Sequence, residues 1–455
     1  MTYESKMVET FFSDYEGYKA DFLKQKEAVA HSKAIYKGEP VPFLYIPKMY
    51  GIEDTKTFEF ALSGIHGLSK KTIDLYLAHA SVRKLFNFDP KLDALIRLPH
   101  YYDTTVPMGR FDIFYYGPGD FQFCELNADG ASAMNEEHEL SQILLETKLT
   151  RKFKESLSME RFELFHSWVN EVKTIYANYL DLAPMTVDER NATEENTKEG
   201  HKPTVAILDF IDKGSSIEFE VFRDAFESDG MDCVIVDPRD LICVDGTLFY
   251  GKIKIDIVYR RLVTKDLIDR YDEIPAFIEG LKAGKTCVIG SIKTQIIHTK
   301  RFFEVLYEPM LRQYFNEDEL AFIDKHVPYT RPLKKDEAFE MYLTHREDYI
   351  IKPIDYYASK GVCAGKDYTD ASWKALLEEK VLEDFIIQKY CPLALVDNIY
   401  EDKEGNLVPK SFSTITGLFT YNEKLSGIYV RAGLNAIISG LHEGYTMSSL
   451  IYKNK

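Results

Sequence analysis

Two acidic residues, an arginine and an amide lie at regular spacing on either side of a strong turn signal. Arg110 and Asp112 lie in "GRFDIFYY", and Glu125 and Asn127 lie in "FQFCELN". The tetrapeptide "GPGD" between these two β-rich runs is typical of a hairpin turn. If the hairpin closes symmetrically, Asp112 faces Glu125 and Arg110 faces Asn127, with all four side chains on one face.

Opposed carboxylates of this kind require a cation. Side chains directly across an antiparallel pair lie about 5 Å apart at Cβ, and like charges at this distance are destabilising. Mg²⁺ binds one or two carboxylates, keeps several waters and leaves its other positions to substrate phosphates. The pattern therefore predicts Mg²⁺ at Asp112 and Glu125, with Arg110 on a phosphate. The alternative is an exposed salt-bridge cluster, and a one-residue slip in register would separate the pairs.

The second run of the hairpin predicts an unusual strand face. In the symmetric register Tyr116 pairs with Phe121. Because alternate strand residues point to the same side, Phe121 and Phe123 would share a face with Glu125 and Asn127. A carboxylate and an amide are not expected at the end of a strand that is buried in the core, but they are expected in a metal or phosphate site.

Polar residues also end two apolar strands further along the chain. Lys352 ends "YIIK" before a loop that contains Lys360, and "DFIIQKYCP" ends in Gln388, Lys389 and Tyr390. A lysine at the end of a buried strand needs an anionic partner, because an unpaired buried charge is costly. A small-residue loop with a lysine can close over phosphates, and a strand end can offer backbone groups to a planar ring. The alternatives are a lysine that extends to solvent and a plain strand end.

The elements that must position these residues change in character along the chain. Strand, helix and strand alternate after a charged linker, which is typical of a small Rossmann-like unit. Ser132 is expected to cap the helix that follows the hairpin. The predicted regions are a helical N-terminal part (1–100), the hairpin and its helices (101–183), the linker (184–203), the Rossmann-like unit (204–290) and the lysine-bearing part (291–455).

Composition limits the classes of partner. A chain of 455 residues with 45% hydrophobic and 28% charged residues predicts two or three globular units. The net charge of −17 argues against nucleic acid and anionic membranes as general partners. No apolar run approaches a membrane span, and the N-terminal stretch lacks a signal-peptide core. Six cysteines without CxxC spacing predict reduced thiols in a cytoplasmic protein.

Taken in order, these residues resemble the circularly permuted ATP-grasp family, typified by the synthetase domain of glutathionylspermidine synthase. The resemblance covers roughly residues 90–450 and implies an α/β ATP-grasp fold with a Rossmann-like pre-ATP-grasp unit and a helical N-terminal region. The matching segments are "RFD" (Arg110, Asp112), "ELNAD" (Glu125, Asn127), "VYRR" (Arg260, Arg261), "HTK" (Lys300), "PYTRP" (Thr330, Arg331), "IIKP" (Lys352), "IIQKY" (Gln388) and "YVR" (Arg431).

The resemblance also implies roles for these residues. The implied cofactors are ATP and Mg²⁺. This sequence departs from the family pattern in two places: the loop after "IIKP" is poor in glycine, and "HTK" stands in place of Asn-Lys. At most one of two adjacent strand arginines would reach the site if they point to opposite faces. The implied roles are Mg²⁺ binding (Asp112, Glu125, Asn127), contact with the transferred phosphate or its acceptor (Arg110, Arg431), ATP phosphate binding (Lys300, Lys352, with Lys360 in the lid), adenine binding (Gln388, Lys389, Tyr390) and substrate binding (Arg260, Arg261).

The implied activity is an ATP-dependent carboxylate–amine ligase. The γ-phosphate moves to a substrate carboxylate, and an amine then attacks the acyl phosphate to form an amide. The expected partners are a small or peptide-like carboxylate and an amine, without nucleic acid or membrane, and a homodimer is left open. Two alternatives remain. The first is a degenerate ATP-grasp protein that binds nucleotide without ligating, and the second is a non-catalytic scaffold or sensor.

Overall fold

The structure of the protein is a computed structural model. It describes residues 2–36, 38–186, 202–212, 216–354, 361–435, 438 and 444–455. Lys360 and most of the linker predicted at 184–203 lie outside these residues. Within them, no helix is both long and apolar enough to cross a membrane.

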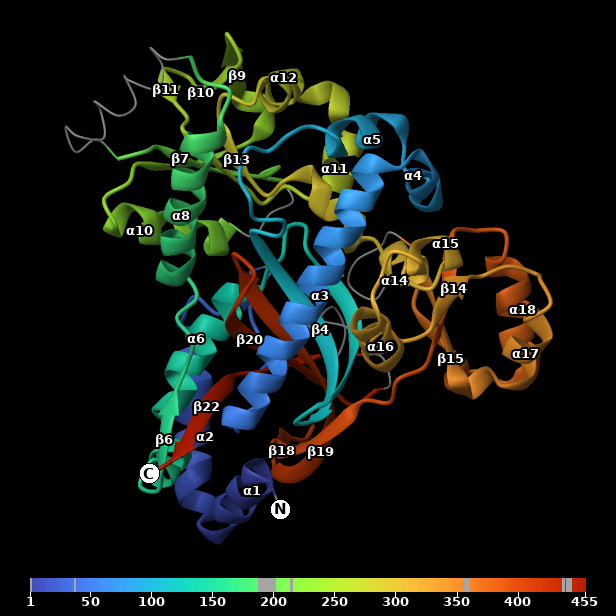
Figure 1. Ribbon diagram of the computed structural model, residues 1–455. Coiled ribbons are helices and arrows are strands. Elements are labelled where there is room, and N and C mark those ends of the chain that lie inside the picture. Colours follow the sequence, from blue (N-terminus) through green and yellow to red (C-terminus); the bar gives the residue numbers. More distant parts are fainter. Residues whose placement is uncertain are drawn as a thin grey trace.

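A six-stranded antiparallel sheet forms the centre of the molecule (Figure 1). Its order is β21 (Tyr445–Met447), β20 (Lys424–Gly433), β19 (Leu407–Tyr421), β4 (Met108–Gly117) and β5 (Asp120–Asn127), and β18 (Ala394–Glu401) also pairs with β19. Helix α3 (Ile52–Ala78) crosses this sheet, and α16 (Glu317–His326) lies beside β5. Strands from the early and the late part of the chain are therefore neighbours.

The β4–β5 hairpin confirms the two predicted polar pairs. Asp112 pairs with Glu125 and Arg110 pairs with Asn127. The predicted Tyr116–Phe121 pair is wrong, because Tyr115 pairs with Phe121. The register shifts once at Tyr116 on β4 and once at Cys124 on β5, so each strand carries one extra residue. The two bulges cancel, and the pairs beyond them regain the symmetric register.

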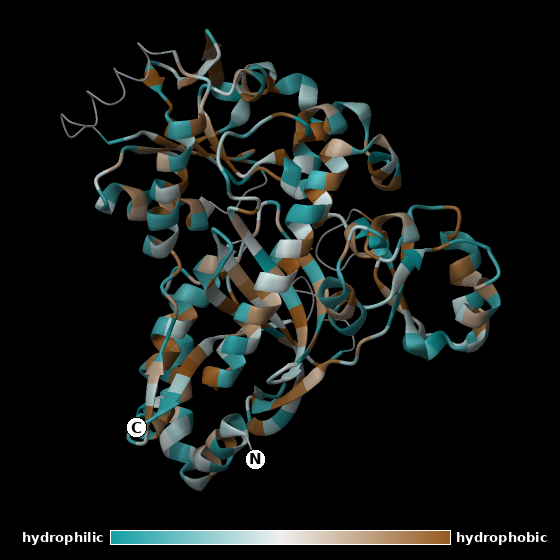
Figure 2. Cartoon of the chain, in the orientation of Figure 1, coloured by the Kyte–Doolittle hydropathy of each residue, from teal (hydrophilic) through white to brown (hydrophobic). Residues whose placement is uncertain are grey.

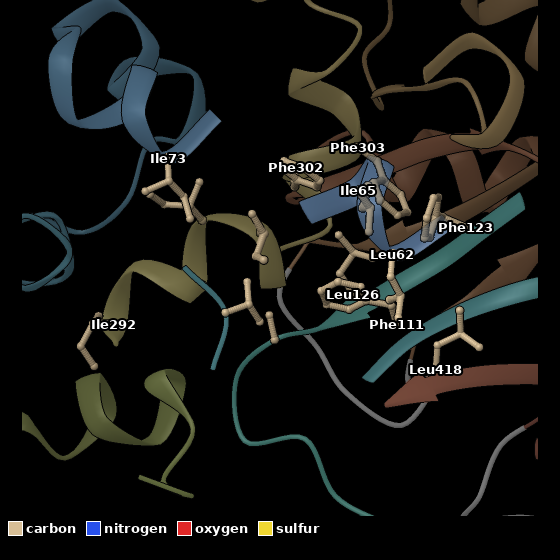
Figure 3. Packing of buried hydrophobic residues seen from close by; sticks show 14 of the residues in the cluster. Leu62, Ile65, Ile73, Phe111, Phe123, Leu126, Ile292, Phe302, Phe303 and Leu418 are labelled. Atoms are coloured by element: carbon tan, nitrogen blue, oxygen red, sulfur yellow. The ribbon is translucent and has the colours of Figure 1, made fainter. Parts of the chain in front are cut away.

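The bulge at Cys124 also corrects the predicted strand face. Ile113 pairs with Phe123 and Asp112 pairs with Glu125. Because Ile113 and Asp112 are consecutive and point to opposite faces, Phe123 and Glu125 do so too. Phe111, Phe123 and Leu126 pack with Leu62 and Ile65 of α3 in the main hydrophobic core (Figure 3), and the polar residues occupy the other face.

The Rossmann-like unit contains a four-stranded parallel sheet. Its strands are almost entirely buried and largely brown in Figure 2, as expected for a sheet covered on both faces. The sheet order is β13 (Cys287–Ile289), β12 (Ile257–Arg260), β7 (Val205–Leu208) and β8 (Cys233–Val236). Its helices are α8 (His166–Leu182), α10 (Ser216–Ser228), α11 (Thr264–Asp269) and α12 (Pro275–Ala283), and α12 also packs on the small sheet β9 (Leu241–Val244), β10 (Thr247–Tyr250) and β11 (Ile253–Lys254).

Residues 330–389 of the lysine-bearing part form a separate four-stranded antiparallel sheet. Trp373 and Leu377 pack with Ile351 and Ile387 to form its core. Its order is β14 (Thr330–Pro332), β17 (Phe385–Lys389), β15 (Tyr349–Pro353) and β16 (Cys363–Ala364), with helices α17 (Phe339–Thr344) and α18 (Asp370–Lys380). The connection to the parallel sheet runs through α13 (Gln295–His298), α14 (Arg301–Val305) and α15 (Pro309–Arg312).

Both ends of the chain meet in the lower part of the molecule (Figure 1). The last strand lies between two strands from the first 160 residues of the chain. That sheet is β3 (Lys48–Tyr50), β22 (Ser449–Asn454) and β6 (Leu157–Glu160), and the helices near it are α1 (Tyr3–Ser13), α2 (Tyr15–Ala30), α6 (Met134–Leu145) and α7 (Lys148–Phe153). The short strands β1 (Ile35–Tyr36) and β2 (Glu39–Pro40) form a pair that contacts α6. The helices α4 (Ala80–Phe86) and α5 (Pro90–Ile96) follow α3 in the upper part of the molecule.

Candidate active site

Asp112 is the centre of a buried charge cluster. Its side chain is buried and accepts hydrogen bonds from Arg110 Nε at 2.9 Å and from Arg431 Nη2 at 2.5 Å. Burial raises the pKa of Asp112, and the two guanidiniums oppose this shift. The structure thus brings Arg431 of β20 to Asp112 of β4, although β19 lies between these strands.

Gly417 makes this contact between β4 and β20 sterically feasible. It pairs with Asp112 on one side of β19 and with Tyr429 on the other. A Cβ atom at Gly417 would lie 2.7 Å from Asp112 Oδ1 and 2.9 Å from Arg110 Cδ. Our sequence reasoning missed this residue. Its signal was a lone glycine inside the long strand "STITGLFTY", which is typical of a close approach.

Glu125 lies next to Asp112 in a more open position. Its Oε1 is 3.6 Å from Arg431 Nη2, and its Oε2 is 4.0 Å from Lys300 Nζ. Burial alone would raise the pKa of Glu125, but Lys300 and Arg431 outweigh it and lower the pKa well below its usual range. Asn127 Nδ2 donates to Asp112 Oδ2 at 3.3 Å and to Glu125 Oε1 at 3.4 Å. The carboxylate of Glu125 is therefore ionised and side by side with Asp112.

Lys352 connects the small sheet to the central sheet. Its Nζ donates to Gln388 Oε1 at 2.7 Å and to the carbonyl of bulged Cys124 at 3.3 Å. Gln388 in turn donates to Thr330 Oγ1 at 2.8 Å. These hydrogen-bond acceptors are neutral oxygens rather than the anionic partner predicted for a buried lysine. The positive charge of Lys352 is consequently available to an anionic ligand.

Lys389 and Tyr390 lie at the exposed end of β17. Lys389 is exposed, and Tyr390 is partly buried with Lys366 Nζ 4.5 Å from its ring centre. Their backbone N–H groups donate to Tyr329 O at 2.9 Å and to Asp348 O at 2.7 Å. These N–H groups are therefore used within the small sheet, and the adenine contacts remain predictions.

Arg260 and Arg261 each pair with a buried carboxylate. Arg260 Nη2 is 2.6 Å from Asp129 Oδ1, and Arg261 Nη2 is 2.6 Å from Glu218 Oε1. Both guanidiniums are almost fully buried, and Arg261 Nη1 also donates to Tyr259. Sequence reasoning missed both acidic partners, because nothing in the sequence pairs residues so far apart. The Arg260–Asp129 pair joins the loop after β5 to the Rossmann-like unit, and the Arg261–Glu218 pair lies within that unit. A role of either arginine in substrate binding stays a prediction.

The charge balance of the site favours an anion with a divalent metal. Two carboxylates, Asp112 and Glu125, face the cationic side chains Arg110, Arg431, Lys300 and Lys352. Among the described residues, no three His, Cys, Asp or Glu side chains form a complete metal site. Two carboxylates and the amide of Asn127 nevertheless fit Mg²⁺, because Mg²⁺ takes its remaining ligands from water and phosphate.

Comparison with known proteins agrees with this architecture. Residues 171–390 match the family model of a circularly permuted ATP-grasp. The solved structure of a glutathione synthetase-like effector, GSS30 from Globodera pallida in its apo form, is similar over 96% of this chain and 97% of that chain, with a TM-score of 0.55 and 12% identity. The fold is thus an ATP-grasp fold. The matched residues make up just under half of the chain, so the family match supports the resemblance to circularly permuted ATP-grasp proteins, and the structural likeness shows the fold.

Other solved structures match smaller parts of the chain. A RimK domain ATP-grasp protein from Sphaerobacter thermophilus covers 54% of this chain and 90% of its own, at 16% identity and a TM-score of 0.30. The D-cycloserine synthetase DcsG covers 54% of this chain and 75% of its own, at 13% identity and a TM-score of 0.28. No curated protein sequence matches.

Proposed function

We propose that the protein is an ATP-dependent ligase that joins a carboxylate to an amine. The observation that carries the proposal is the convergence of two carboxylates and four cationic side chains from several elements, centred on fully buried Asp112. Burying charge at this density is costly, and it is expected where a phosphoryl group must be positioned and neutralised. A scaffold or sensor gains nothing from this arrangement.

Each side chain has a defined task in this proposal. Lys300 and Lys352 neutralise the phosphates of ATP, and Arg110 and Arg431 orient the phosphoryl group and the substrate carboxylate. Asp112, Glu125 and Asn127 would hold Mg²⁺, which would supply further charge neutralisation when bound. Transfer of the γ-phosphoryl group to the carboxylate gives an acyl phosphate. The amine nitrogen then forms a bond to the acyl carbon as the C–O bond to phosphate breaks.

The substrates belong to chemical classes rather than to named compounds. The acid is a small or peptide-like carboxylate. The best-known activity of the family that this sequence resembles is glutathionylspermidine synthesis. The candidate that binds nucleotide without ligating differs in one measurable respect, because it would bind Mg·ATP and release no ADP.

An ADP-release screen tests the proposal. The protein is incubated with Mg·ATP and pools of carboxylates, with hydroxylamine present to trap acyl phosphates as hydroxamates. We expect carboxylate-dependent ADP and hydroxamate in equal amounts. Thermal stabilisation by Mg·ATP without ADP release would instead identify the non-ligating alternative, and no stabilisation at all would support the scaffold or sensor.

Substitution of Lys352 tests the nucleotide site. Lys352→Met is expected to weaken ATP binding about 10- to 100-fold, because a hydrogen bond from a charged group contributes about 1.5–3 kcal/mol. Methionine retains the buried stem, so the fold is expected to persist. Calorimetric titration with ATP measures the effect. Lys374→Met, which removes an exposed lysine of the same lobe, serves as the matched control, and equal affinity in both variants would contradict the assignment.

A further inference from the structure

A lysine and a histidine form a hydrogen-bonded pair outside the phosphate site. Lys293 lies in the short turn η3 (Ile292–Thr294) that follows β13, and His100 lies in the segment that follows α5. Lys293 Nζ donates to His100 Nδ1 at 2.9 Å, and both side chains are only partly buried. An amine and an imidazole at this distance have the spacing of a nucleophile and the group that positions it.

The partner of Lys293 in this pair is uncharged. Burial, and after it the charge of Lys293, lower the pKa of His100 to about 3, so the imidazole is neutral at neutral pH. The imidazole ring is held by a hydrogen bond to the backbone of Tyr102 and by an edge-on contact with the Tyr102 ring, with ring centres 4.4 Å apart. A neutral partner favours the ammonium form of a lysine less than a carboxylate does.

Lys293 forms no ion pair with a carboxylate in the residues that the structure describes. The carboxylate that acts on it is Asp74 of α3, and Asp74 is already bound to Lys70 Nζ at 2.8 Å. Burial therefore lowers the pKa of Lys293, although the charge of Asp74 opposes this shift. Lys148 and Lys380 differ, because hydrogen bonds to carboxylates raise their pKa. The surroundings of Lys293 thus favour its unprotonated, nucleophilic amine.

The pair is fixed at the carboxyl end of the parallel sheet. Tyr102, which holds His100, donates its hydroxyl to Val288 O of β13 at 3.1 Å and accepts from Ser291 N at 3.2 Å. The segment that carries His100 is thereby bound to the segment that leads into Lys293. Small molecules reach open α/β sheets mostly from the carboxyl ends of the strands. The amine is therefore held on a rigid part of the fold, at an edge suited to small ligands.

We propose that Lys293 is a modification site that captures acyl groups from acyl phosphates. The Nζ lone pair forms a bond to the acyl carbon, the C–O bond to phosphate breaks, and one Nζ proton leaves with the phosphate. The product is an Nζ-acyl lysine, which has lost its positive charge and keeps one N–H for His100. The acyl phosphate comes from solution or from the reaction of this protein, and only the second source rests on the proposed ligase function.

Added acetyl phosphate tests the site without any nucleotide. The full chain is incubated with acetyl phosphate, and mass spectrometry follows acetylation of Lys293 and of exposed Lys374, the internal control. We expect Lys293 to react about tenfold faster, which corresponds to about 1.4 kcal/mol in activation free energy. His100→Gln retains a neutral acceptor and should keep this rate, whereas His100→Glu supplies a carboxylate and should reduce it to that of Lys374. Equal rates at the two lysines in wild type would overturn the proposal, and equal Lys293 rates in the two variants would overturn the role of the neutral partner.

A second arm identifies the source of the acyl group. Wild type is incubated with Mg·ATP and isotope-labelled carboxylates, without acetyl phosphate. Label on Lys293 would show that the protein captures its own acyl phosphate. Hydroxamate formation in a parallel reaction with hydroxylamine, without label on Lys293, would restrict capture to acyl phosphates from solution. Absence of both ADP and hydroxamate would overturn the proposed ligase function instead, and the acetyl phosphate arm still decides the modification site.

Discussion

Replacing Glu125 by glutamine is expected to lower ADP release by about 10³-fold, the loss typical of removing one electrostatic group from a phosphoryl-transfer site. The melting temperature should fall only slightly. The nearest cations are 3.6 and 4.0 Å from its oxygens, so Glu125 makes no tight ion pair whose loss would unfold the protein. Binding of Mg²⁺ and phosphate would depend on the charge of Glu125 far more than the fold does.

The pH dependence of stability gives a second measurement on the same variant. The pKa of Glu125 is lowered in the folded protein, so Glu125 contributes stability above its unfolded pKa and loses it as pH falls. Glu125→Gln should therefore be less sensitive to acid than wild type. Asp120→Asn, at the exposed start of the same strand, is the control, and turnover within tenfold of wild type in Glu125→Gln would contradict the metal assignment.

Asp112→Asn is expected to abolish turnover and to destabilise the protein by about 3–5 kcal/mol. The difference from Glu125 lies in burial. Asp112 is buried between Arg110 and Arg431, and its loss leaves Arg110 without its ion-pair partner and Arg431 with only Glu125, 3.6 Å away. Urea denaturation measures the change in the free energy of unfolding.

A double variant shows whether this cost comes from the uncompensated arginines. Adding Arg431→Met to Asp112→Asn removes one of the two orphaned charges, so the double variant should lose less stability than the sum of the single variants. Additive losses would show that Asp112 stabilises the fold through something other than Arg431.

The polar pairs of the hairpin could be predicted because they depend on local chemistry. The "GPGD" turn and the equal spacing of the R-x-D and E-x-N segments placed Asp112 opposite Glu125. The bulges could not be predicted, because their contacts come from remote parts of the chain. Tyr116 donates its hydroxyl to Pro392 O, and Cys124 offers its carbonyl to Lys352. The predicted pairs survived only because the two shifts are equal.

Buried ion pairs between residues far apart in the sequence could not be predicted either. The arginines of "VYRR", Arg260 and Arg261, were expected to bind substrate because the resemblance to the ATP-grasp family implies it. In the fold they meet Asp129 and Glu218 from other elements. Glu218 also replaces the cap expected from Ser132. Sequence identifies which residues carry charge, and only the tertiary structure shows which of those charges are already neutralised.

The composition of the central sheet has a consequence for synthesis on the ribosome. Asp112 and Arg431 are 319 residues apart in the sequence. At about 5–20 residues per second, the ribosome adds Arg431 about 15–60 s after Asp112. During that time the edge of β4 that later pairs with β19 is open. A chain that ends at Leu393, before β18, should leave the hairpin open to proteolysis, and full protection would contradict this. The nascent protein therefore depends on residues 394–455 to complete its central sheet.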